Sequence, residues 1–429
     1  MKKQLLAALA AMAVMAGAFA QNFPAYLRMN GTVITGCDKD EVPDNLVIPE
    51  GVTVIAQNAF ENCAYLESVV IPGSVTKIGT DVFKNCTSLE SVTISDGATF
   101  VGGFEGCALL ANVTLPASVK VINSDAFSGC KALANITIPE GVEEIGDSAF
   151  RGSGLKTVTI PASVKVIGEN AFKECTSLAS VTIAEGVEKI CDSAFRESAL
   201  KTVTIPASVK VIGENAFKEC TSLASVTIAE GVEEIGEYAF YKTALKTVAI
   251  PASVKEIGGI AFYGCASLES ATIAEGVKVI GEYAFCRSGL KTIMIPKSVR
   301  EIGEHAFSEC TSLESVTLSR GITKLTYSFV NCKALRSIAI PRSVTEIDRT
   351  FDGCINPVVQ FDGTKAQWET TTYKNYFSRA NCTDGSVGIM EIPPYLYLQG
   401  TKVIGCDKDK LPSKVVIPED VTEIGAMAF

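Results

Sequence analysis

The sequence predicts a solenoid of about fourteen stacked repeats, in which short parallel strands alternate with short helical turns. The first observation is a period: phenylalanine recurs every 22 or 23 residues from Phe60 to Phe351, with one interval of 21 residues before Phe104. The second is that the same apolar spacing returns around each phenylalanine. A fixed period of this length indicates a repeat architecture. It replaces the two or three separate domains that a chain of 429 residues would otherwise suggest.

One repeat shows what each of its parts does. In residues 178–183 (Leu-Ala-Ser-Val-Thr-Ile), apolar and polar residues alternate, so we expect a strand with Val181 and Ile183 pointing inward. Proline often follows such a strand and ends it, because proline has no N–H for the ladder. Residues 163–167 (Ser-Val-Lys-Val-Ile) predict a second extended piece, and residues 169–174 (Glu-Asn-Ala-Phe-Lys-Glu) predict one helical turn.

A single repeat cannot be stable alone. Each contributes roughly seven apolar side chains, worth about 1.5–3 kcal/mol apiece when fully buried. Ordering about 22 residues costs a similar or larger amount. Stability must therefore come from stacking, as in other solenoids. At about 4.8 Å per strand step, fourteen turns would form a rod or arc roughly 65 Å long.

The cysteines follow the repeat. Ten of the fifteen lie three residues after a repeat phenylalanine: Cys63, Cys86, Cys107, Cys130, Cys175, Cys220, Cys265, Cys310, Cys332 and Cys354. Elsewhere this position is Ser153, Ser198, Thr243 or Ser288. Exchange with Ser and Thr indicates a need for small size, which predicts reduced thiols in a buried stack. Disulfides between neighbours, common in exported chains, and zinc ligation are the alternatives.

The first twenty residues predict export. Lys2 and Lys3 precede an apolar stretch, and Ala18-Phe19-Ala20 offers a cleavage site before Gln21, which is the layout of a secretory signal peptide. No later segment reaches about 18 uninterrupted apolar residues, so we expect no transmembrane segment. The net charge of −10 makes nucleic acid an unfavourable partner.

The rest of the chain divides around the repeats. We expect an N-terminal cap at 21–46, the solenoid at 47–354 and a C-terminal cap segment at 355–392. Residues 24–60 and 393–429 align without a gap. The second of these ranges therefore predicts the start of a second repeat array, apparently truncated.

A family resemblance is carried by the motif Ile-Pro-x-Ser-Val-x-x-Ile-Gly-x-x-Ala-Phe-x-x-Cys-x-x-Leu, as at 205–223. It covers nearly all of 47–354 and resembles the BspA-like, Treponema-type leucine-rich repeat proteins. Residues 361–368 also resemble the segment that closes such arrays. The resemblance implies a leucine-rich repeat solenoid, surface exposure in host-associated bacteria, and adhesion to host extracellular components. The asparagine or cysteine that ordinary leucine-rich repeats carry just past the strand is Ser163 or Gly186 here, so an asparagine ladder cannot hold the turns.

We find no pattern that predicts catalysis, a cofactor or a metal site. Covalent catalysis by Ser or Cys usually needs a base, most often histidine. The single histidine, His305, occupies a repeat position that is elsewhere Asn170 or Tyr283. Residues 152–157 fail the spacing of a phosphate loop. Residues 38–41 are acidic but lack the spacing of a calcium loop. The sequence therefore favours a non-enzyme.

The strand face is the candidate ligand-contact surface. Its outward column contains Thr137, Thr159, Thr182, Thr204, Thr227 and Thr272, beside Lys156, Lys201, Lys246 and Lys291. Threonine also suits any exposed strand, so a purely structural explanation competes with a hydroxyl array for binding. Residues 155–188 and 200–233 are identical, which favours a multivalent surface over one unique pocket.

We therefore predict an exported or cell-surface scaffold, monomeric, that binds a protein or glycoprotein and serves adhesion to host extracellular matrix. The alternative is a spacer or stalk that presents another domain and has no ligand of its own.

Overall fold

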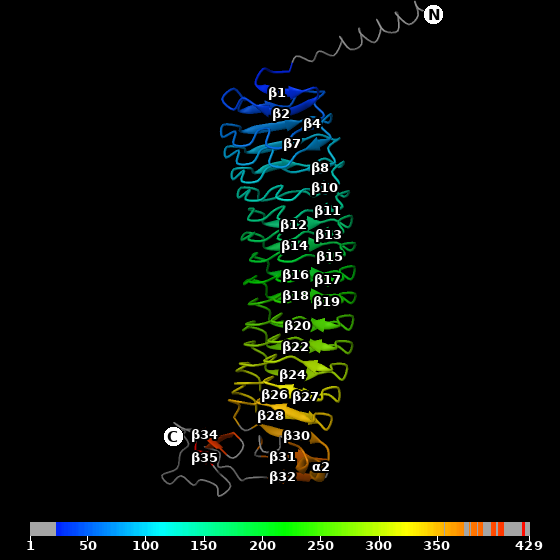
Figure 1. The fold of residues 1–429 in the computed structure, drawn as a ribbon, viewed down its shortest axis with the longest axis vertical. Helices are drawn as coiled ribbons and strands as arrows, with labels where there is room; N and C mark the ends of the chain where they lie inside the picture. Colours follow the sequence, from blue (N-terminus) through cyan, green and yellow to red (C-terminus); the bar gives the residue numbers. More distant parts are fainter. Residues whose placement is uncertain are drawn as a thin grey trace, which may run out of the picture.

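The computed structural model describes residues 23–355, 357–372, 377, 379–383, 385–388, 396–399, 402–406 and 423–424. The expected signal peptide lies outside these residues, as do parts of the segments expected at 355–392 and 393–429. From β1 to β32, the chain forms a straight column of stacked turns (Figure 1).

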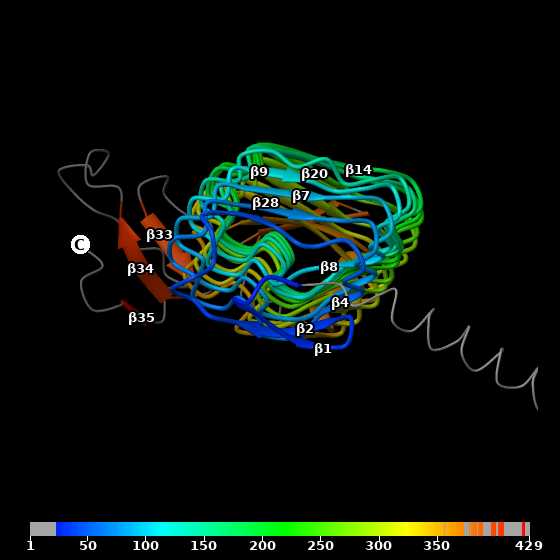
Figure 2. The same cartoon turned by 90° about the horizontal axis from the view of Figure 1, so that it is seen from above.

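Each regular turn contributes one longer and one shorter strand, and the two kinds lie on opposite sides of the column (Figure 2). The longer strands are β3 (Asn45–Val47), β5 (Ser68–Ile71), β7 (Ser91–Ile94), β9 (Asn112–Thr114), β12 (Thr157–Ile160), β14 (Ser180–Ile183), β16 (Thr202–Ile205), β18 (Ser225–Ile228), β20 (Thr247–Ile250), β22 (Ser270–Ile273), β24 (Thr292–Ile295), β26 (Ser315–Leu318), β28 (Ser337–Pro341) and β30 (Val358–Asp362).

The shorter strands stack in parallel behind the entry hairpin. β1 (Leu27–Asn30) pairs antiparallel with β2 (Val33–Cys37), and β2 begins the parallel series. The series continues through β4 (Val54–Ile55), β6 (Lys77–Ile78), β8 (Phe100–Val101), β10 (Val121–Ile122), β11 (Glu144–Ile145), β13 (Val166–Ile167), β15 (Lys189–Ile190), β17 (Val211–Ile212), β19 (Glu234–Ile235), β21 (Glu256–Ile257), β23 (Val279–Ile280) and β25 (Glu301–Ile302). β27 (Lys324–Thr326) and β29 (Glu346–Asp348) form a separate parallel pair.

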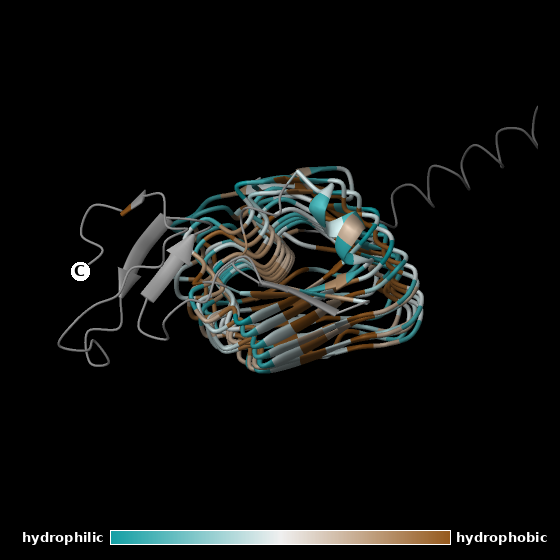
Figure 3. Ribbon diagram, turned by 90° about the horizontal axis from the view of Figure 1, so that it is seen from below, coloured by the Kyte–Doolittle hydropathy of each residue, from teal (hydrophilic) through white to brown (hydrophobic). Residues whose placement is uncertain are grey.

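The core is one continuous column of apolar side chains. Along each longer strand, hydrophobic and hydrophilic residues alternate (Figure 3), and Val181 and Ile183 of β14 point inward as predicted. The repeat phenylalanines stack face to face from Phe60 to Phe351, with ring centroids 5.1–5.9 Å apart. The cysteines of the small position are buried, also as predicted, and the described cysteines carry free thiols.

The expected helical turn at 169–174 is wrong. Asn170 and Glu174 both have left-handed backbone conformations, with φ of 54° and 61°. Their N–H groups donate to the carbonyl oxygens of Asp192 and Arg196 in the following turn, and not within their own turn. A left-handed residue other than glycine costs about 1–2 kcal/mol, so inter-turn bonds must hold this shape. Among the described residues, the only α-helix is α2 (Lys365–Glu369), and no helix has the length and apolar character to cross a bilayer.

The last described turns cover the end of the core. β30 pairs with β31 (Arg379–Cys382), which pairs with β32 (Gly385–Gly388). The fully buried Trp368 of α2 packs against Phe361 and Phe377.

Further along, β33 (Leu396–Gln399), β34 (Lys402–Cys406) and β35 (Glu423–Ile424) repeat the pairing of β1, β2 and β4. The antiparallel register agrees pair for pair, including its irregularity after the second pair. The entry pattern of the first column is therefore used a second time, at the strands where the sequence duplication falls.

Candidate binding surface

The structure brings several predicted threonines together as pairs. Thr159 of β12 lies opposite Thr182 of β14, and Thr204 of β16 lies opposite Thr227 of β18. All four side chains are exposed on the longer-strand face, because the alternate valines and isoleucines fill the core. Thr272 of β22 is exposed as well, but its partner in β20 is Ala249. The result is a row of hydroxyl pairs.

The predicted lysines lie at the start of the same face. The group consists of Lys156, Lys201, Lys246 and Lys291, each exposed and just before a longer strand. Only the last has an ion pair among the described residues, with Lys291 Nζ 2.6 Å from Glu269 Oε2. Both side chains are more than half exposed, so this pair contributes at most about 1 kcal/mol. The other lysines present cations to solvent.

Along the longer-strand face, well-paired neighbouring strands alternate with neighbouring strands that are poorly paired, which we call weak steps. β12 and β14 share four residue pairs, whereas β14 and β16 share one. The same alternation continues, because β16 and β18 share four pairs while β18 and β20 belong to different sheets. One contribution comes from the residue after each strand. Ala184 N–H donates to Ile160 O, but Pro206 has no N–H to donate to Ile183 O.

Side chains cross each weak step instead. The Glu185 carboxylate accepts hydrogen bonds from the N–H groups of Ala207 and Ser208, at 3.2 and 3.1 Å. The Ser208 hydroxyl accepts one from Gly186 N–H at 2.9 Å. Glu230 and Glu275 make the corresponding bonds one and two units later. For Glu230, these backbone donors lower the pKa of the carboxyl group.

The structural unit is therefore a pair of turns. One turn ends its strand with Pro-Ala-Ser, and the next ends it with Ala-Glu-Gly. This explains why the exact internal copy recurs at an offset of two repeats and not one. The identical copy was found in the sequence, but the two-turn structural unit behind it was not predicted. The alternation of the two tripeptides is visible in the sequence and could have indicated it.

Thr137 departs from the expected column. Residues 134–138 form no strand, and β9 and β12 on either side belong to different sheets. Here three successive strand segments are each followed by proline, at Pro116, Pro139 and Pro161. The face opens here into a groove of about 580 Å³, which Thr137 and Thr159 line together with apolar Val113 and Ile138. This groove was not predicted.

The structure shows no poised nucleophile at the residues considered for catalysis. His305 is stacked between Tyr283 and Tyr327, with ring centroids 4.8 and 5.1 Å away. Its Nδ1 lies 3.1 Å from Ser308 Oγ, and that hydroxyl already donates to Tyr327 O. Burial raises the pKa of the Cys175 thiol to about 11, so it stays neutral. The described part of the chain contains no cluster of three or more metal-ligating side chains.

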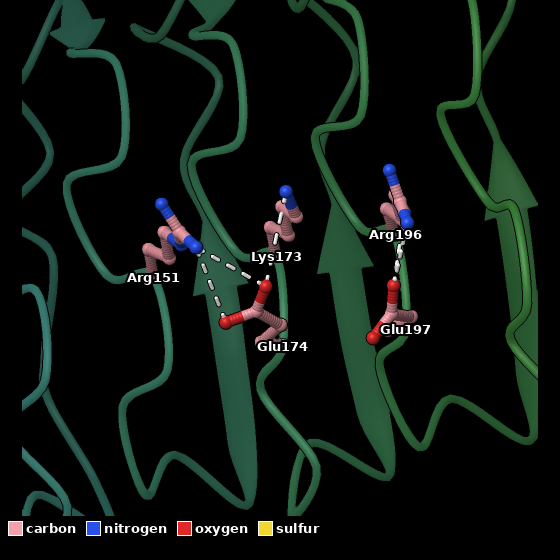
Figure 4. A network of polar contacts seen from close by, with 5 residues as sticks. All are labelled: Arg151, Lys173, Glu174, Arg196 and Glu197. Carbon is pink, nitrogen blue, oxygen red and sulfur yellow. Dashed lines mark hydrogen bonds and ion pairs between the residues drawn. The ribbon is translucent and has the colours of Figure 1, made fainter.

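A second exposed surface runs along the turns around the phenylalanines. In its central part, basic and acidic residues form ion pairs within a turn and, at Arg151 and Glu174, between successive turns (Figure 4). Arg151 and Lys173 meet the carboxylate of Glu174 at 3.2 and 3.8 Å, and Arg196 meets Glu197 at 2.9 Å. Such partly exposed pairs contribute little to stability. In two later turns, Tyr241 and Tyr263 take the place of the basic residue.

Comparisons with known proteins agree with this architecture. The model of the BspA type leucine rich repeat region matches in overlapping copies at residues 43–153, 101–224, 146–269, 188–313 and 233–358. A leucine-rich repeat protein from Bacteroides ovatus shares 30% identity over 83% of this chain and 96% of its own, with a TM-score of 0.60. A leucine rich cell surface protein from Faecalibacterium prausnitzii also shares 30% identity, over 82% of this chain and 98% of its own, with a TM-score of 0.46. No curated protein matches significantly. Because the family model spans most of the sequence and the column shows the repeat directly, the chain belongs to the BspA-type leucine-rich repeat proteins.

Proposed function

We propose that this protein is an exported, cell-surface scaffold whose longer-strand face binds an extracellular protein or glycoprotein. The observation that carries the proposal is the row of exposed, in-register threonine pairs, Thr159–Thr182 and Thr204–Thr227, repeated in identical two-turn units. Each hydroxyl can donate and accept a hydrogen bond. Lys156, Lys201 and Lys246 add cations at the same spacing.

Repetition is what would give such a face useful affinity. A single threonine pair is a weak site, since hydroxyl contacts replace hydrogen bonds to water with little net gain. Linked copies bind as one ligand and gain avidity without new kinds of contact. An extended glycoprotein with repeated acceptors fits this geometry, and adhesion would follow from many weak contacts.

The test is binding of the full chain to immobilised host extracellular glycoproteins at physiological salt. The variant Thr182→Glu, Thr204→Glu, Thr227→Glu places carboxylates in the row without touching the core. A matched control puts the same change at Thr176, Thr221 and Thr311, which are exposed in the loops before the strands. Loss of saturable binding in the first variant alone supports the proposal. Unchanged binding by the folded first variant would remove the strand face from consideration.

A second candidate function is a stalk that presents another domain. It is favoured by β33, β34 and β35, which restart the entry pattern after the first column. A stalk needs columns in series and no ligand. Absence of binding by the well-folded full chain to every protein of the panel would favour it over adhesion.

Export itself is tested by separating cell fractions and sequencing the N-terminus of the mature protein. A start at Gln21 in the surface or secreted fraction supports the proposed localisation. Full-length protein retained in the cytoplasm would contradict it.

A further inference from the structure

The turn surface changes composition in its later part. Two residues before each repeat phenylalanine, earlier turns carry small polar residues such as Asn170, Ser193 and Asn215. The next five turns carry bulky residues at the same position: Tyr238, Ile260, Tyr283, His305 and Tyr327. One residue after the phenylalanine, Tyr241 and Tyr263 replace the earlier basic residues.

The backbone does not change with the side chains. Asn170 and Asn215 have φ of 54° and 57°, and the five bulky residues have φ between 50° and 59°. The inter-turn bond is also kept, since Asn170 N–H donates to Asp192 O just as Tyr283 N–H donates to Glu304 O. Asparagine tolerates this left-handed region, whereas a β-branched residue such as Ile260 is a genuine outlier there. Four of these five turns therefore carry residues that suit their own backbone poorly, and His305 is the exception because histidine also tolerates this region.

Most rings of these turns are stacked, and several of their faces are covered. His305 lies between two tyrosine rings, and the Tyr241 and Tyr263 centroids are 5.4 Å apart. Cations lie over further rings: Lys218 Nζ lies 4.8 Å from the Tyr238 centroid, and the Arg287 guanidinium lies 5.7 Å from that of Tyr263. An aromatic ring is negative on its face and positive at its edge. This surface therefore offers electropositive ring edges and hydroxyl groups.

The lysines of this surface also make different contacts from the basic residues drawn in Figure 4, which form ion pairs. Lys218 and Lys242 lie over tyrosine rings and form no ion pair among the described residues. Their charges remain available to an incoming carboxylate. On the other side, the exposed Glu237, Glu282 and Glu304 border the rings.

We propose that this tyrosine ledge, defined as Tyr238, Tyr241, Tyr263, Tyr283, His305 and Tyr327 with Lys218 and Lys242, docks a polypeptide partner. The partner brings carboxylates and carbonyl oxygens to the lysines and ring edges, and basic groups to the bordering glutamates. A sugar ring would need open aromatic faces, and several faces here are already occupied by neighbouring rings and cations. Tyrosine is also among the residues enriched in protein-binding hot spots.

A docked partner gives a reason for retaining unfavourable residues. Strained positions persist where the surrounding structure holds them and where the strained residue has a use. The ledge lies between the shorter strand and the next longer strand of each turn, so it is separate from the threonine row. It does not depend on the function proposed for that row.

The test compares the full chain with a ledge variant that restores uncharged residues of earlier turns: Tyr238→Asn, Ile260→Asn, Tyr283→Asn, Tyr327→Asn, and Tyr241→Ser and Tyr263→Ser as at Ser128. A displayed library of random linear peptides is selected on the wild-type protein. We expect enriched peptides to be rich in Asp and Glu and to bind the variant about tenfold more weakly or worse. A second variant, Lys218→Gln with Lys242→Gln, keeps the rings and should also weaken these peptides.

The thermal midpoint provides a readout that requires no partner. Asparagine suits the left-handed backbone, so we expect the ledge variant to melt at the wild-type temperature or above it. A lower midpoint would show that the rings are there to stabilise the turns, and would overturn the inference. Failure to enrich any peptide, equal binding of the peptides to both proteins, or ledge-dependent binding of neutral oligosaccharides in place of peptides would also overturn it.

Discussion

Two stretches of the longer-strand face differ although their repeats are of the same kind. In the first stretch, β12 pairs closely with β14, and β16 pairs closely with β18. Between these two pairs of strands, glutamate side chains make the connecting hydrogen bonds. Between β9 and β12, the strand pairing is lost and a groove opens. One contribution to the difference is the residue after each strand segment, which alternates between proline and alanine in the first stretch and is proline every time in the second.

The packing of the core beneath this face is nearly the same in the two stretches. The Phe104–Phe127 and Phe127–Phe150 centroids are 5.6 and 5.4 Å apart, against 5.2 Å for Phe172–Phe195. The turn bonds also persist, since Phe127 N–H donates to Ala149 O at 2.7 Å. Core stacking and turn bonds therefore hold the column, and the strand face can vary above them. A surface that can vary without unfolding the column is suited to recognition.

The prediction with the largest expected effect concerns whether the core is packed equally tightly in the two stretches. Phe217→Ala and Phe127→Ala should each lower the free energy of unfolding by about 3–5 kcal/mol, because each leaves a cavity in the same stack. Denaturant titration of both variants measures the loss. A loss at Phe127 smaller by more than about 1 kcal/mol would mean that the groove extends into a looser core, and that the two stretches differ below the surface as well.

The sequence predicted the parts that obey simple periodicity. The inward Val181 and Ile183, the phenylalanine stack and the buried cysteines follow from apolar spacing, which burial enforces in every turn. The turn at 169–174 was mistaken for a helix because its residues favour helices locally, whereas bonds to the next turn decide its shape.

The candidate surface was predicted only in part. The exposure of Thr159 and Thr182 follows from alternation along a strand. The loss of strand pairing around Thr137 involves its neighbouring turns, which alternation within one strand does not reveal. The tyrosine ledge was not predicted, since it depends on a backbone conformation that spacing alone does not give.

The next effect concerns the buried thiols, whose pKa values differ between the two stretches. Burial raises the pKa of Cys130 to about 12, whereas the pKa of Cys175, with the Ser153 hydroxyl 3.4 Å away, reaches about 11. The ordinary value is 9.0. The unfolded thiol loses its proton first as pH rises, so this contribution to stability is complete below about pH 9 and is lost as pH rises toward the folded value. Cys175 should contribute about 2–3 kcal/mol to that loss by pH 11.

Unfolding free energies of wild-type protein and Cys175→Ala near pH 8 and pH 11 measure this contribution. The variant should lose less stability between the two pH values than the wild type. Equal losses in both proteins would show that this thiol does not titrate differently on unfolding.

A smaller effect is expected at the glycine that follows the glutamate in the Ala-Glu-Gly turns. Gly231 has φ of +127°, and a Cβ there would lie 2.1 Å from Ala207 O, so Gly231→Ala should cost about 1–3 kcal/mol. Gly141 holds the same repeat position beside the groove, where a Cβ would come no closer than 3.3 Å to Ala117 O. Gly141→Ala should cost less than about 1 kcal/mol. Thermal melting of the two variants tests the difference, and equal shifts would contradict the idea that only the first stretch closes tightly.

Pro139→Ala should have the smallest effect on stability but the most direct effect on the groove. Pro139→Ala restores an N–H that can reach Leu115 O, a gain of about 0.5–1.5 kcal/mol. Loss of proline's restraint on the unfolded chain offsets about 0.4–1 kcal/mol of it, so the melting temperature should barely move. Hydrogen exchange at residues 135–139 should nevertheless slow, because the ladder closes across the groove. Unchanged exchange in the folded variant would show that missing donors are not what opens this face, and the groove would need a cause in the side chains that line it.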